Sequence, residues 1–155
     1  MLRVLADGED RHRIEDAAGR EVGWIRGRVI GLCGFADVSH AMAAAAPAWR
    51  ALDAVLRRTF AGWPRYAPAF DALRPMHDGI DEWLTDGHTR IALVMRTPQD
   101  PWHDASHAHG LTLAFALPSY AHEGLAVSAA QLMGEAVHGL VSETVPRSRV
   151  TPDAA

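Results

Sequence analysis

Three histidines in one polar segment have the side-chain type and the spacing that metal binding requires. His103, His107 and His109 lie within the sequence PWHDASHAHG. If the segment makes one helical turn, His103 and His107 share a face and His109 completes a set of three nitrogens. Neutral imidazoles bind zinc and other first-row transition metals, and three protein ligands with an open position is the catalytic pattern. The spacing matches no specific zinc motif, so a polar surface loop without metal is the favoured interpretation.

A short acidic segment carries a second candidate group. Asp81 and Glu82 are adjacent, with Asp78 before them and His77 and His88 on either side. Two carboxylates held close together can acquire different pKa values and act as acid and base. His77 and Asp81, four residues apart, could also join the loop histidines if the fold brings the two segments together. An acidic face in contact with solvent explains the segment equally well and is the favoured interpretation.

The single cysteine is the third candidate. Cys33 lies a few residues before a predicted helix, where the helix dipole would favour a thiolate, and His40 or His122 could serve as its base. However, its context GLCGF lacks the GxSxG pattern of a nucleophile turn. Free cysteine is among the residues most often buried, so burial is favoured. One cysteine also excludes an internal disulfide and indicates a reducing compartment.

Aromatic residues collect in a proline-rich segment between residues 61 and 76. Trp63, Tyr66 and Phe70 alternate with prolines, which forbid a long regular element. Such aromatics either cover the edge of the core or line a groove for a small molecule or a peptide. Covering the core is the favoured interpretation, and the same three residues form the candidate ligand-binding set.

The motifs that would identify a common enzyme class are absent. The chain contains no GxSxG, HExxH, CxxC, EF-hand loop or dinucleotide fingerprint. All 15 cationic residues are arginine, so Schiff-base lysine chemistry and a P-loop lysine are excluded. No cofactor is expected, except that zinc or another first-row transition metal would fit the histidine segment.

The amino-acid composition bounds the class of protein. At 155 residues the chain suits one domain, predicted over residues 1–141 with a flexible tail over 142–155. The net charge of -4 gives no broad basic field, so nucleic acid is not an expected partner. No segment offers the ~20 apolar residues that span a bilayer or resembles a signal peptide, which predicts a cytoplasmic protein without a membrane partner. The lack of both lysine and asparagine indicates GC-rich coding and a bacterial source.

Periodicity predicts the strands that would position these groups. Strands are expected at residues 12–15, 89–96 and 111–117. Residues 22–35 form either one long strand or, as favoured, a hairpin with its turn at Arg26-Gly27. Residues 80–84 lie between two Asp-Gly turns and are predicted as a short helix.

Two long helices are predicted as well. The first is capped by Asp37 or Ser39 and is kinked or divided at Pro47. The second covers residues 123–141. The resulting order is a duplicated ββα arrangement, an α+β domain in two layers with an antiparallel sheet and the helices on one face. An open sheet leaves edges or a free face for association, so a homodimer is expected.

Two functions from different classes remain. The preferred one is a non-enzymatic binding or protein-interaction module, because no strong catalytic motif is present and the aromatic segment could line a groove. The alternative is a metal-dependent, zinc-type hydrolase with His103, His107 and His109 as ligands and Asp81 or Glu82 as the base.

Overall fold

The chain forms two successive units, each of four strands followed by a helix. The computed structural model describes residues 2–60, 68–96, 110–119 and 121–144. The first unit consists of β1 (Arg3–Ala6), β2 (Arg11–Glu15), β3 (Glu21–Arg26), β4 (Val29–Phe35) and α1 (Val38–Thr59). The second consists of the short 3-10 helix η1 (Phe70–Ala72), β5 (Arg74–Asp78), β6 (Asp81–Thr85), β7 (Arg90–Arg96), β8 (Leu111–Ala116) and α2 (Glu123–Thr144).

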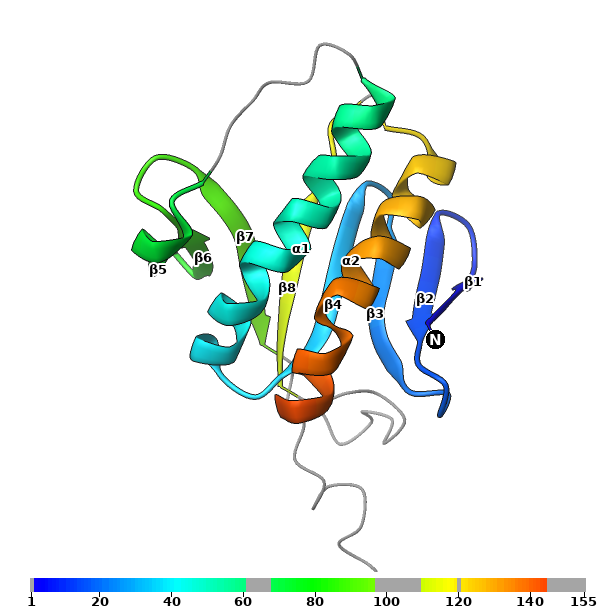
Figure 1. Ribbon diagram of the computed structural model, residues 1–155, viewed down its shortest axis with the longest axis horizontal. Helices are drawn as coiled ribbons and strands as arrows, with labels where there is room; N and C mark the ends of the chain where they lie inside the picture. The colour runs from blue at the N-terminus through cyan, green and yellow to red at the C-terminus, as the bar shows by residue number, and fades with distance from the viewer. Residues whose placement is uncertain (1, 61–67, 97–109, 120, 145–155) are drawn as a thin grey trace, which may run out of the picture.

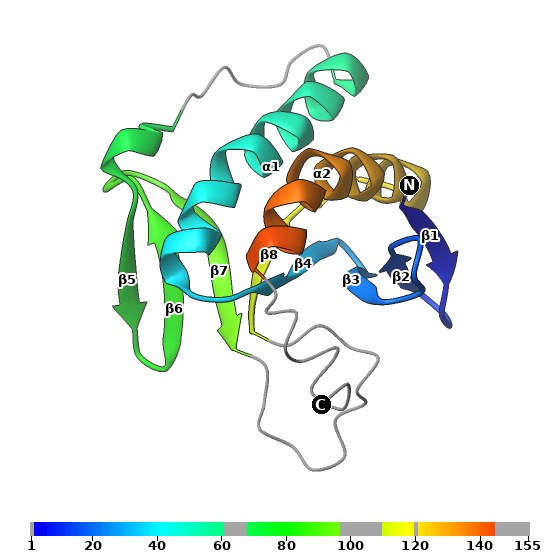
Figure 2. The same ribbon diagram turned by 60° about the horizontal axis from the view of Figure 1, so that its bottom comes forward.

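All eight strands belong to one antiparallel sheet in the order β1-β2-β3-β4-β8-β7-β6-β5. The two units meet where β4 pairs with β8 at the centre of the sheet. Both helices pack side by side on the same face, as Figures 1 and 2 show. The predicted two-layer α+β fold is therefore confirmed. Each unit has four strands rather than the predicted two, and an internal duplication stays a prediction.

The hairpin predicted for residues 22–35 is present, but its turn is displaced by one residue. Arg26 pairs with Val29, so the turn is Gly27-Arg28 rather than Arg26-Gly27. Gly27 has a φ of +60°. Because some two-residue hairpin turns require a positive φ at their first central position, glycine there fixes the register.

The short helix predicted at residues 80–84 is wrong. Residues 81–84 belong to β6, which forms a hairpin with β5 through Gly79 and Ile80. Gly79 has a φ of +65°, which suits the tight turn. Hydrogen bonding to β5 and β7 on both sides decides the structure, and five residues carry too little periodicity to show it. Pro75 lies in β5, at the edge of the sheet, where a residue without an N–H is tolerated.

The first long helix begins as predicted and continues through its proline. Asp37 caps α1, accepting a hydrogen bond from the backbone N–H of His40 at 2.9 Å. Pro47 lies inside α1, which is one helix and not two. Packing of its apolar side against the sheet and α2 outweighs the lost hydrogen bond. The second helix, α2, begins at Glu123 as predicted and runs to Thr144, into the segment predicted as a tail.

The core lies between the sheet and the two helices. Its largest fully buried side chains come from five strands and α2: Phe35, Phe115, Ile14, Ile25, Ile30, Leu32, Leu84, Leu113, Met133 and Val137. The buried side of α1 is mostly alanine, at Ala41, Ala44, Ala45 and Ala48. Small side chains let α1 lie close to the sheet and to α2.

One buried carboxylate fixes the turn between β2 and β3. Asp16 is 4% exposed and accepts hydrogen bonds from the backbone N–H of Ala18 at 2.9 Å and of Arg20 at 3.0 Å. The Arg20 guanidinium also donates to it at 3.0 Å. Burial by itself would raise the pKa of Asp16, but the hydrogen bonds and charge of Arg20 outweigh it and hold the pKa below its ordinary value.

This arrangement predicts an acid-dependent loss of stability that Asp16→Asn should remove. A folded-state pKa below the unfolded value stabilises the fold above the unfolded pKa, and this contribution is lost as the pH falls through the folded pKa. We expect Asp16→Asn to lower the free energy of unfolding by about 1–3 kcal/mol near neutral pH, and by progressively less as the pH falls through the folded-state pKa of Asp16. Urea unfolding of the wild type and of Asp16→Asn at several pH values measures this loss of unfolding free energy and its pH dependence. A loss of equal size at every pH would contradict the role of the Asp16 carboxylate.

Candidate functional site

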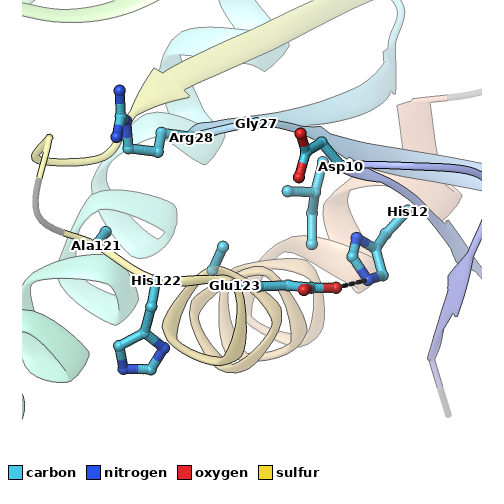
Figure 3. Close-up of a pocket in the computed structure, with 9 residues that line it drawn as sticks. Asp10, His12, Gly27, Arg28, Ala121, His122 and Glu123 are labelled. Carbon is cyan, nitrogen blue, oxygen red and sulfur yellow. Dashed lines mark ion pairs between the residues drawn. The ribbon is translucent and has the colours of Figure 1, made fainter.

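A cavity of about 330 Å³ lies where the β1–β2 turn, the β3–β4 turn and the N-terminus of α2 meet (Figure 3). Three segments far apart in the sequence therefore build it. Its lining consists of Asp10, His12, Ile25, Gly27, Arg28, Ala121, His122, Glu123 and Ala126. A volume of this size falls at the lower end of the range of small-molecule sites, roughly 300–1,000 Å³.

Asp10 is held at the cavity by an unusual backbone conformation. Its φ is +57°, the only positive φ at a residue other than glycine in the described part of the chain. Its carbonyl oxygen accepts a hydrogen bond from the backbone N–H of Gly27 at 2.8 Å, which ties the β1–β2 turn to the β3–β4 turn. The carboxylate points toward the cavity (Figure 3). It forms no hydrogen bond or ion pair with any residue that the structure describes.

An imidazole and a carboxylate join β2 to the first turn of α2. Nε2 of His12 lies 3.1 Å from Oε1 of Glu123. The His12 side chain is 10% exposed and that of Glu123 is 72% exposed, so the pair runs from the wall of the cavity to its mouth (Figure 3). A carboxylate at the N-terminus of a helix is further stabilised by the helix dipole. One carboxylate oxygen of Glu123 thus contacts His12 at the cavity.

Two other polar residues at the cavity have structural roles. Nδ1 of His122 accepts a hydrogen bond from the backbone N–H of Leu125 at 3.1 Å and so caps α2. Its ring points away from the cavity (Figure 3). The Arg28 guanidinium donates to the carbonyl oxygen of Ser119 at 2.7 Å, which fixes the connection from β8 to α2. It points away from Asp10 as well (Figure 3).

The lining of the cavity combines carboxylates, which accept hydrogen bonds, with apolar side chains. The Asp10 carboxylate has no donor among the described residues, Glu123 has His12 on one of its oxygens, and Ile25 and Ala126 add hydrocarbon to the lining. A carboxylate accepts hydrogen bonds only. The complementary ligand therefore carries several N–H donors, a positive charge and a short hydrocarbon part.

The histidine segment lies outside the described residues. His103, His107 and His109 belong to residues 97–109, and their role as metal ligands stays a prediction. Among the residues that the structure describes, no group of three histidine, cysteine, aspartate or glutamate side chains is arranged to hold a metal ion. The zinc-type hydrolase consequently stays a prediction too.

The acidic candidates lie on the β5–β6 hairpin, at the opposite edge of the sheet from the cavity. His77 and Glu82 are paired across the hairpin, with Nε2 and Oε2 3.9 Å apart. Glu82 is buried, whereas Asp81 is exposed at the turn. Asp78 accepts a hydrogen bond from Arg90 at 2.7 Å. The structure thus brings His77 and Glu82 together but separates them from Asp10 and Glu123.

His88 contributes to a turn. Its backbone N–H donates to the Asp86 carboxylate at 2.9 Å, as does the N–H of Thr89. Asp86 is 7% exposed and also accepts a hydrogen bond from the N–H of Ala69 at 3.2 Å. This carboxylate therefore organises the β6–β7 turn and anchors the chain ahead of η1.

Phe70 packs against α1. Its ring centroid lies 5.9 Å from that of Trp49 in an edge-to-face arrangement, and the Arg50 guanidinium lies 5.2 Å from its centroid. Trp49 also lines a second cavity of about 140 Å³ between α1, β7 and β8. Phe70 thus contacts the edge of the core. A ligand site shared with Trp63 and Tyr66, which lie outside the described residues, stays a prediction.

Cys33 is buried on the sheet, and neither candidate base serves it. Burial raises the pKa of its thiol to about 12, despite a hydrogen bond with Thr112 that acts in the opposite direction. Nδ1 of His40 lies 3.2 Å from the Asp37 carboxylate, and His122 caps α2. The thiolate is therefore strongly disfavoured at this position.

We expect Cys33 to resist alkylation while the protein is folded. Labelling with iodoacetamide near pH ~8 should proceed at the rate of global or local unfolding and become fast only in denaturant, because the thiolate is the reactive form. Mass spectrometry of the alkylated peptide measures both rates. Rapid stoichiometric labelling of the native protein would show that the thiol is accessible and ionised.

Comparison of the chain with models of known protein families, with curated proteins and with solved structures finds no match. None of the described helices is both long enough and apolar enough to cross a membrane. The case for a function therefore rests on the geometry and chemistry of the cavity itself.

Proposed function

We propose that this protein is a non-enzymatic binding protein whose ligand is a small organic cation held in the cavity at the N-terminus of α2. The observation that carries the proposal is the Asp10 carboxylate, which is directed into the cavity without a donor from the described residues. A ligand ammonium or guanidinium group would supply the missing donors and a neutralising charge. Ion pairing is the interaction that would give affinity, and because Asp10 is exposed and the Glu123 side chain is 72% exposed, solvent and salt screen it.

The second carboxylate is already oriented for the same ligand. His12 contacts one oxygen of Glu123, which restrains an otherwise exposed side chain at the mouth of the cavity. Restraining a binding group before the ligand arrives reduces the entropy that binding must lose. The two carboxylates would therefore take the two ends of a diamine, or the two sides of one guanidinium, above Ile25 and Ala126.

The lining favours binding over catalysis. It contains no serine, threonine, cysteine, lysine or tyrosine among the described residues, so no side-chain nucleophile of these types faces the ligand. Arg28 and His122 could polarise a substrate, but both are already hydrogen-bonded within the protein. Arg28 donates to the carbonyl oxygen of Ser119, and His122 accepts from the backbone N–H of Leu125. A bound cation would be retained chemically unchanged.

Isothermal titration calorimetry with 1,4-diaminobutane and agmatine tests the proposal. We expect one site per chain, and at least a tenfold rise in Kd, about 1.4 kcal/mol, for Asp10→Asn and for Glu123→Gln, because each removes one ion pair. Asparagine tolerates a positive φ as aspartate does, so Asp10→Asn should keep the turn intact. Binding should weaken as salt is added.

Matched controls separate this site from general charge effects. Glu135 is an exposed glutamate of α2 hydrogen-bonded to Gln131, away from the cavity, and Glu135→Gln should leave the Kd unchanged. Succinate, a dicarboxylate of similar length, should not bind. Failure of both cations to bind, or equal affinity in wild type and in the two cavity variants, would refute the proposal.

A further inference from the structure

Two histidines adjoin the Glu123 carboxylate at the cavity. His12 contacts it across space, with its Nε2 3.1 Å from Oε1 of Glu123, and His122 precedes it in the chain. Histidine is the side chain whose ordinary titration changes its charge between about pH 5 and 8. The charge around Glu123 therefore depends on whether these two imidazoles carry a proton.

His122 is the N-cap of α2. Its carbonyl oxygen accepts a hydrogen bond from the N–H of Ala126 at 3.1 Å, and Nδ1 of its ring accepts one from the N–H of Leu125 at 3.1 Å. The ring thus satisfies an N–H that the first turn of a helix leaves without a partner. An imidazole nitrogen accepts a hydrogen bond only while it carries no proton, so His122 can cap α2 only while its ring is neutral. The usual capping residues serine, threonine and asparagine do not have this dependence on pH.

The ring of His122 lies over the first turn of α2. It points away from Asp10 (Figure 3), and a Cβ added to Gly124 would come 3.3 Å from its Nδ1, so glycine at this position leaves room for the ring. Together with Arg58 of α1, the ring lines a further cavity of about 380 Å³. A proton on His122 would therefore add a positive charge at the positive end of the dipole of α2, in a cavity that Arg58 also lines.

Loss of the cap would act first on Glu123. This residue is the first of α2 and follows the cap directly. Leu125 and Ala126 are buried and keep the rest of the turn packed. Glu123 is exposed, and among the described residues its restraint comes from the cap next to its backbone and from His12 at its side chain. His122 is thus a positioning residue for one of the two carboxylates that we assign to the ligand.

Protonation of His12 would compete with the ligand directly. Its side chain is 10% exposed, so an added positive charge would be held at the wall of the cavity, against Glu123. The contact would then become an ion pair within the protein, and the Glu123 carboxylate would be neutralised before a cation arrives.

The other charged groups around the two histidines come from four parts of the fold. Among the described residues that line the two cavities, Asp10 lies in the β1–β2 turn, Arg28 in the β3–β4 turn, Arg58 near the end of α1 and Glu123 at the start of α2. As side-chain types, carboxylates titrate at lower pH than histidine and arginine at much higher pH. Between about pH 5 and 8, the change of charge at the cavity is therefore the change at His12 and His122.

We propose that the cavity releases protons from His12 and His122 to the solvent when it binds its cation, so that the ligand is held near neutral pH and released in acid. The inference rests on the proposed function and adds its regulation. A proton on His122 removes the cap that positions Glu123, a proton on His12 occupies the Glu123 carboxylate, and either proton adds positive charge that repels the ligand cation. Because linked equilibria are reciprocal, protons that weaken cation binding are expelled by the cation to the same extent.

Isothermal titration calorimetry with 1,4-diaminobutane at constant ionic strength tests the coupling. The amines of this probe keep their charge because alkylammonium groups, like that of lysine, titrate well above the range in which histidine does. We expect the Kd to rise about tenfold or more from about pH 8 to pH 5, and about one proton to be released per cation bound near pH ~6.5. Titrations in two buffers that differ in their heat of ionisation give the number of protons.

Two substitutions keep the contacts of the histidines without their change of charge. Asparagine at position 122 is a preferred N-cap, and glutamine at position 12 retains an N–H donor for Glu123. In the double variant His12→Gln with His122→Asn, the Kd at about pH 5 should exceed that at about pH 8 by about threefold or less. The control His77→Gln removes a histidine at the opposite edge of the sheet and should keep the wild-type ratio of the two Kd values.

A measurement without ligand tests the cap by itself. The stability that neutral His122 contributes is present at high pH and is lost as the pH falls and the ring takes up a proton. The folding equilibrium constant of His122→Asn, relative to that of the wild type, should therefore be roughly threefold or more larger at about pH 5 than at about pH 8. Urea unfolding at both pH values measures it. A relative constant that does not change with pH would overturn the part of the coupling assigned to His122.

The possible outcomes separate the coupling from the function on which it rests. A wild-type Kd that is the same in acid and at neutral pH would overturn the coupling and leave cation binding in place. A double variant that keeps the wild-type ratio of Kd values would do the same. If the cation binds at no pH, the proposed function and the coupling both fail, whatever the result for the cap.

Discussion

The antiparallel pairing of β4 with β8 is the contact on which the rest of the molecule depends. It joins two four-stranded meanders into one sheet, and each of its strands leads directly toward a helix. The two strands run in opposite directions, so α1 and α2 cross the same face from opposite ends and pack against each other. The pairing at the centre of the sheet therefore sets the end of the sheet from which each helix enters the covered face.

The sequence predicts local elements, such as helices and turns, better than it predicts which strands pair with one another. Asp37 as a cap and the long apolar pattern of residues 123–141 lead to the correct elements because each depends on neighbours along the chain. The β3–β4 turn lies one residue later than predicted because Gly27 belongs to both candidate turns, and only the pairing of Arg26 with Val29 shows which turn position the glycine occupies. The helix predicted at residues 80–84 is wrong because five residues carry too little periodicity to separate a helix from a strand, and pairing with β5 and β7 decides the structure.

The candidate site was less accessible to sequence reasoning than the fold. His12 and Glu123 come from opposite ends of the chain and meet only because α2 returns across the sheet to β2. Neither residue belongs to a motif, and Asp10 resembles any aspartate of a turn. The one available signal was Asp7-Gly8 followed by Glu9-Asp10, which marks a turn but not the direction of a side chain. Conversely, the metal site predicted in the histidine segment rests on residue type and spacing alone. Neither shows whether the three imidazoles lie close enough together to bind one ion.

The edges of the sheet bear on how this protein behaves at high concentration. An unpaired edge strand is a template to which other chains can add, and long flat edges lead to fibrous aggregation. Here β1 has only four residues, and β5 contains Pro75, which lacks an N–H for a further strand. The sheet therefore ends at eight strands in both directions. Growth by strand addition is blocked at each edge, which should keep a protein with so apolar a sheet from seeding amyloid-like assembly.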